Sequence, residues 1–117
     1  MLRSHPRALR FARTVDPSER NVSVVSYLEV LQGCRDRREA NDLKTFMGEW
    51  FTEILPLTTE ISDSAVLLME QFALSHRPGV DDTLIAATAL TRREIVTTRN
   101  VKHFDFIPGL VVQRFRV

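Results

Sequence analysis

Apolar and polar residues follow a regular pattern along this chain, and their spacing predicts helices that alternate with short strands. Several segments have apolar residues three and four positions apart, which is typical of helices with one buried face. Between them lie short runs rich in β-branched residues, which are typical of strands. The predicted helices cover residues 1–15, 26–33, 35–51, 58–72 and 80–91, and the predicted strands cover residues 21–25, 53–57, 94–98 and 110–117.

The helix predicted over residues 80–91 is apolar around most of its circumference. A helix of this kind is buried on nearly all sides, and its alanines allow neighbouring backbones to approach closely. Because strands and helices alternate, we expect an α/β domain with a mostly parallel sheet. The apolar and small residues of this helix are Leu84, Ile85, Ala86, Ala87, Ala89 and Leu90.

Composition limits the class of protein without indicating a function. The chain has 117 residues, of which 44% are hydrophobic and 26% charged, so one globular domain is expected and a disordered or collagen-like chain is excluded. The 16 basic residues nearly balance the 15 acidic ones, so net charge does not favour nucleic acid or a membrane. With Cys34 as its single cysteine, no signal-peptide core and no membrane-length apolar stretch, the chain is expected in the cytoplasm.

The start of the chain departs from the usual order of an α/β domain. Such a domain usually begins with a strand that lies in the middle of the sheet, whereas this pattern begins inside a helix, which carries a stripe of arginines. A sheet without its middle strand would leave two unpaired edges in the core. We therefore expect a single domain over residues 1–117 that is N-terminally incomplete and lacks its first, central strand.

Polar residues near the carboxyl ends of the predicted strands are the candidates for chemistry, because ligands of doubly wound sheets bind there. Carboxylates that converge from separate elements are suited to a hard cation such as Mg²⁺ or Mn²⁺. Such a cation activates water and neutralises phosphoryl charge. The candidates are Glu29, Asp81, Asp82, Thr98, Asn100 and His103.

The two acidic segments also have structural interpretations. Glu29 stands three residues after Ser26, which is the spacing of a helix capping box. Asp82 could serve as a first-turn acid that stabilises the helix dipole, with Asp81 as the N-cap. The strongly apolar helix that follows Asp82 favours a functional position, because a buried carboxylate requires a partner.

The remaining candidates are less specific. Asn100 lies in a sequence typical of a turn, and a histidine such as His103 is by itself more often a packed or exposed loop residue than a ligand. His76 and His5 lie in no recognisable motif, and we assign them no function.

Three segments of the chain resemble the PIN-domain ribonucleases, and most closely the VapC-type toxins of bacterial toxin–antitoxin pairs. They occur in the expected order at suitable spacing, and the resemblance extends over nearly the whole chain. The segments are SVVSYLEVLQG at 23–33, DTLIAATA at 82–89, and TRNVKHF at 98–104 followed by PGL at 108–110.

The resemblance implies a PIN-like three-layer α/β/α domain with a five-stranded parallel sheet. It also implies a metal-dependent endoribonuclease that uses Mg²⁺ or Mn²⁺, acts on RNA, binds a cognate antitoxin protein and forms a homodimer. Glu29 and Asp82 match the second and third acidic positions of the family and would hold the metal, while Asn100 matches the fourth. Supporting positions are Thr98, His103 and Asp81.

The first acidic position of the family, an aspartate on the opening strand, has no match in this sequence. The chain as given is therefore expected to have weak or no activity. Two alternatives stay open: a catalytically impaired or inactive PIN remnant that acts only as a protein-binding module, and a nuclease that acts on DNA.

Overall fold

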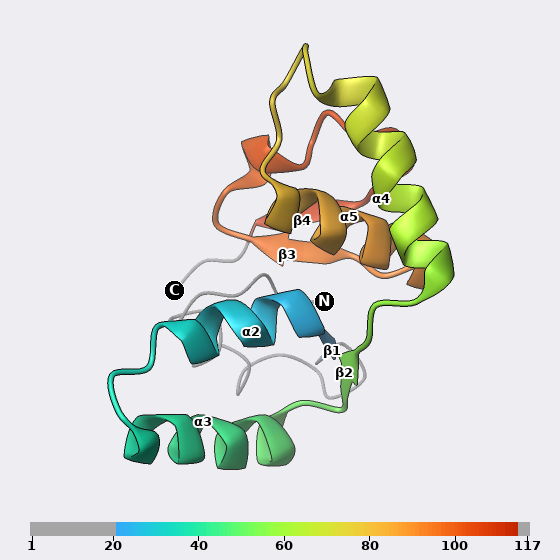
Figure 1. The fold of residues 1–117 in the computed structure, drawn as a ribbon. Coiled ribbons are helices and arrows are strands. Elements are labelled where there is room, and N and C mark those ends of the chain that lie inside the picture. Colours follow the sequence, from blue (N-terminus) through green and yellow to red (C-terminus); the bar gives the residue numbers. More distant parts are fainter. Residues whose placement is uncertain (1–20, 115–117) are drawn as a thin grey trace.

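The computed structural model describes residues 21–114 as an α/β arrangement of short strands and longer helices (Figure 1). The helix predicted over residues 1–15, its arginine stripe and the last three residues of the segment 110–117 lie outside the described residues. The helices are α2 (Val24–Gln32), α3 (Arg37–Trp50), α4 (Thr59–Phe72), α5 (Val80–Arg92) and the short 3₁₀ helix η3 (Val101–His103). The strands are β1 (Asn21–Ser23), β2 (Glu53–Leu55), β3 (Val96–Thr98) and β4 (Val112–Arg114).

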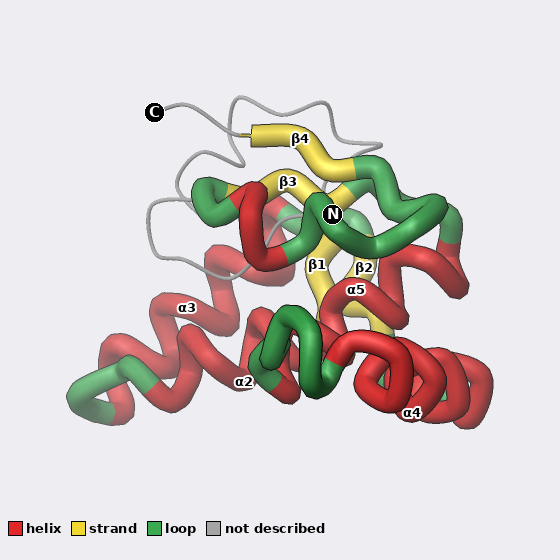
Figure 2. The backbone as a smooth tube through the Cα atoms, turned by 90° about the horizontal axis from the view of Figure 1, so that it is seen from above, coloured by secondary structure: helices red, strands yellow, loops and turns green. Residues whose placement is uncertain are grey.

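The four strands form two parallel pairs. β1 pairs with β2, and β3 pairs with β4, so the expected α/β class with parallel pairing is confirmed. Figure 2 shows α2, α4 and α5 gathered on one side of the strands. Between residues 21 and 114 no backbone pairing joins the two pairs, but the Asn21 amide donates to Glu94 Oε1 at 2.6 Å. The expected absence of a middle strand stays a prediction.

The first described helix begins earlier than its sequence pattern predicts. Val24 and Val25 are helical rather than extended, and Ser23 is the N-cap, since its hydroxyl accepts a hydrogen bond from the Ser26 amide at 3.1 Å. The predicted capping box of Ser26 with Glu29 is therefore wrong. Both serines are buried. Ser23 lies directly before the helix, where its hydroxyl can accept from an amide of the first turn that has no carbonyl partner within the helix.

The start of α3 is likewise fixed by a side-chain cap. Asp36 accepts from the Glu39 amide at 2.8 Å, so the helix begins at Arg37 and not at Arg35 as predicted. Glu39 in turn accepts from the backbone and guanidinium of Arg35. These hydrogen bonds lower the pKa of the Glu39 carboxyl.

Two strands begin later than predicted because neighbouring turns use amides at their expected starts, and a third ends early at a proline. The amide of Glu94 donates to the carbonyl of Ala89 at 2.8 Å and closes the end of α5, so β3 begins only at Val96. Leu110 donates to Ile107 in a turn before β4. Pro56 has no amide hydrogen, so β2 ends at the residue before it, as its position near a strand end implied.

The predicted burial of the helix over 80–91 is confirmed. Ile85, Ala86 and Ala89 have no exposed surface and lie in the main core with Val96 and Phe104. α4 packs along α5, and the small side chain of Ala87 meets Ile61 and Ala65 there. This packing places the first turn of α5 at the edge of the core.

Replacement of Ser23 by alanine tests the cap of α2. The hydroxyl and its hydrogen bond to the Ser26 amide are lost, so we expect the free energy of unfolding to fall by about 1–2 kcal/mol. Urea denaturation followed by circular dichroism measures this change. Ser62→Ala, at an exposed position inside α4, is the control and should change stability by less than about 0.5 kcal/mol. Equal effects of the two substitutions would contradict the assigned cap.

Candidate functional site

Asp81 and Asp82 both lie in the first turn of α5. The helix begins from Gly79, whose carbonyl accepts from the Thr83 amide at 3.0 Å, so the interpretation of Asp81 as the N-cap is wrong. The Asp82 side chain is only 10% exposed. A carboxylate in this place is stabilised by the positive end of the helix dipole.

A short chain of contacts connects the end of β3 to the start of α5. The Thr98 hydroxyl, which is fully buried, accepts from the Asn100 amide at 3.0 Å. The Asn100 carbonyl accepts from the His103 amide at 3.0 Å and so forms the 3₁₀ turn η3. The ring of His103 then places Nδ1 3.0 Å from Asp82 Oδ2. Four of the candidate residues are thereby brought into one connected structure.

A cavity of about 440 Å³ opens beside this structure. Three of the candidate residues line it, namely Asp81, Asp82 and His103, whereas Glu29, Thr98 and Asn100 do not. The other lining residues come from the loop before α5 and from the segment around η3. They are His76, Arg77, Pro78, Gly79, Lys102 and Phe106.

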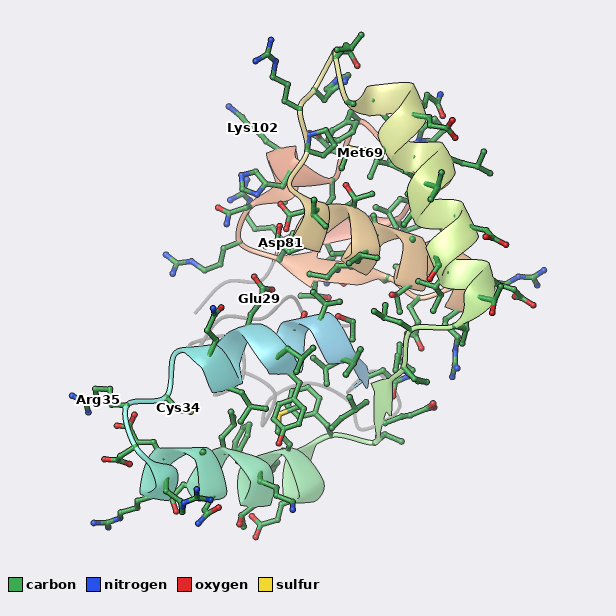
Figure 3. The ribbon with its side chains drawn as sticks, viewed as in Figure 1. Glu29, Cys34, Arg35, Met69, Asp81 and Lys102 are labelled. Carbon is green, nitrogen blue, oxygen red and sulfur yellow. The ribbon has the colours of Figure 1, made fainter. Side chains whose placement is uncertain are left out.

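Glu29 approaches this region from a different helix. It is half-buried on α2, which packs against α5, and Figure 3 shows it on the side of α2 that faces Asp81. Within residues 21–114, however, no three His, Cys, Asp or Glu side chains lie together as a ligand group. Joint binding of a metal by Glu29 and Asp82 therefore stays a prediction.

The donors at the cavity fit a hard cation, although they do not enclose one. Mg²⁺ prefers oxygen ligands and is commonly held by one or two carboxylates, with water and substrate phosphate completing its coordination. Asp81 and Asp82 offer such oxygens at the edge of the cavity. A set of carboxylates that stays open to the cavity is compatible with this mode of binding.

The aromatic part of the cavity lining was not foreseen from the sequence. The ring of His76 stacks on Phe106, with centroids 4.1 Å apart and an interplanar angle of 11°, and Ser75 Oγ lies 2.8 Å from His76 Nδ1. Phe106 is distant along the chain, so no local spacing links the two rings. The nearest sequence signal is the Arg77–Gly79 loop, which leads directly into the Asp82 helix.

No helix in the described part of the chain has the length and apolarity needed to cross a membrane.

Comparison with known proteins gives structural neighbours only. No family model and no curated protein sequence matches the chain. Among solved structures, VapBC-1 from nontypeable Haemophilus influenzae is similar with a TM-score of 0.73 and 23% identity, covering 93% of this chain and 85% of that one. A toxin–antitoxin complex from Klebsiella pneumoniae gives 0.69 and 23%, covering 92% and 84%.

A third neighbour is the DNA-bound VapBC from Salmonella typhimurium, with a TM-score of 0.69 and 20% identity over 93% of this chain and 85% of that one. At these identities the likeness concerns the fold. The expected PIN-like α/β fold is thus confirmed, and the chain has the fold found in VapBC toxin–antitoxin complexes.

Proposed function

We propose that this chain is a metal-dependent endoribonuclease and the toxin component of a toxin–antitoxin pair. The observation that carries the proposal is the position of Asp82, a nearly buried carboxylate at the start of an apolar helix, beside a cavity and held by His103. A charged group in this position is costly unless it has partners or a ligand. The shared fold with VapBC complexes supports the same assignment.

Asp82 would hold the cation together with Glu29 from α2, and Asp81 would support the site from the same turn. A bound Mg²⁺ or Mn²⁺ supplies charge neutralisation at the phosphodiester and activation of a water molecule. His103 Nδ1 lies 3.0 Å from Asp82 Oδ2 and would orient the carboxylate. Loss of an outer contact that orients a metal ligand typically changes metal affinity or activity by about 10- to 100-fold.

Asn100 and Thr98 act through the position of the turn. The hydroxyl of Thr98 fixes the Asn100 amide, and the Asn100 carbonyl fixes the turn that carries His103. Asn100 itself is exposed at the end of β3, where its side chain can orient water or RNA. The partners that follow from this proposal are single-stranded RNA as substrate, a cognate antitoxin protein and a second copy of the chain.

A non-catalytic protein-binding module is the second candidate function. It is favoured by one observation, namely that residues 21–114 contain no group of three clustered acidic or metal-binding side chains. Such a module would retain the fold and the antitoxin surface without cleaving RNA.

Replacement of Asp82 by asparagine tests the catalytic assignment. The amide keeps the shape of the side chain but removes the charge, so RNA cleavage with Mg²⁺ or Mn²⁺ should fall by about 100-fold or more. Cleavage of a labelled RNA is followed on a denaturing gel. Asp63→Asn removes a carboxylate from an exposed position on α4 and should leave the rate unchanged. If the wild-type chain does not cleave with either metal, the binding module becomes the better assignment.

Metal binding is also measurable without any RNA. Mg²⁺ or Mn²⁺ should raise the melting temperature of the wild-type chain, since binding to the folded state at 100 times Kd adds about 2.7 kcal/mol of stability. EDTA should abolish the increase, and the Asp82→Asn chain should show little of it. A similar metal-induced increase in the wild-type and Asp82→Asn chains would place the cation elsewhere.

A further inference from the structure

We propose that Arg77 and Lys102, together with the stacked rings of His76 and Phe106, form a subsite that binds the RNA strand next to the scissile phosphate. This inference rests on the proposed function and extends it to substrate binding. All four residues line the same cavity as Asp81 and Asp82. The cavity lining therefore combines two carboxylates with two cations and two stacked aromatic rings.

The two cations of this subsite are not neutralised by the protein. Two arginines of the described chain are paired with carboxylates, Arg35 with Glu39 and Arg92 with Glu53. Neither Arg77 nor Lys102 forms an ion pair or side-chain hydrogen bond within residues 21–114, and both are exposed at the cavity. A phosphodiester that enters the cavity can accept from both side chains without breaking an existing ion pair.

The backbone position of Arg77 gives a second indication. Its φ of 46° is left-handed, and its amide donates to the Phe72 carbonyl at 3.2 Å at the end of α4. Glycine or asparagine usually adopts such a backbone conformation, because a Cβ atom is unfavourable there. The hydrogen bond to Phe72 thus fixes the backbone of Arg77 at the rim of the cavity.

The aromatic part of the wall is held in place by its neighbours. Phe72 packs at an angle on both rings, with centroids 5.6 Å from His76 and 5.0 Å from Phe106. The hydrogen-bonding contact between Ser75 and His76 Nδ1 further fixes the histidine ring. Cations beside a rigid aromatic surface are the combination that single-stranded nucleic acid binds, by phosphate contact and base stacking.

Binding can be measured separately from cleavage. The probe is a fluorescein-labelled single-stranded RNA of about 10 nucleotides, within the range that single-strand grooves contact. Fluorescence anisotropy of the full chain in EDTA, at several salt concentrations, gives Kd and its salt dependence. Loss of one phosphate contact should reduce the slope of log K against log salt by about 0.7, which corresponds to about fivefold weaker binding at 0.1 M salt.

Arg77→Gln and Lys102→Gln should each show this loss, and His76→Ala should weaken binding without a change of slope. Matched controls are Arg37→Gln and Lys44→Gln, which remove the same charges from exposed positions on α3. Figure 1 shows α3 at the opposite end of the molecule from the loop between α4 and α5. Circular dichroism verifies that each variant is folded.

Several outcomes would overturn the subsite. They are equal weakening by the controls, no effect of the cavity variants, and no binding of RNA by the wild-type chain. Equally tight binding of single-stranded DNA of the same sequence would overturn its assignment to RNA. If RNA binding depends on Arg77 and Lys102 but no metal supports cleavage, the subsite is supported and the proposed nuclease function fails.

Discussion

The burial of α5 is the constraint on which the remaining structure depends. Its apolar and small side chains face α4 on one side and the main core on the other, so the helix cannot lie at the surface. Alanines at three positions make this packing close, because they let neighbouring elements approach the helix axis. A polar side chain on such a buried helix must therefore either lie at one end of the helix or form a hydrogen bond to the helix backbone.

The polar residues of α5 satisfy this requirement in two ways. Thr83 and Thr88 are buried, and their hydroxyls donate to carbonyls one turn earlier, Gly79 and Leu84. Asp82 instead lies in the first turn and contacts His103 from η3. The same helix that builds the core therefore presents a carboxylate to the cavity, and the Thr98–Asn100 hydrogen bond sets the turn that meets it.

The sequence predicted the order of the elements and the buried helix, because both follow from periodicity within one segment. It misplaced the start of α2, since Ser23 and Ser26 are both suitable caps and only the fold decides between them. Asp82 was identified from its apolar surroundings. The stacking of His76 on Phe106 could not be predicted, because it depends on how two loops meet in space.

Arg77 and Arg93 share a left-handed backbone; Arg93 directly follows α5, whereas Arg77 lies in the loop after α4. Glycine would relieve about 1 kcal/mol of steric strain at either position. Arg93 lines a different cavity, so this change would leave the cavity beside Asp82 as it is, whereas at Arg77 it would remove a cation from that cavity. The two arginines thus allow the stability cost of a left-handed residue that ends a helix to be compared with that of one at the proposed binding surface.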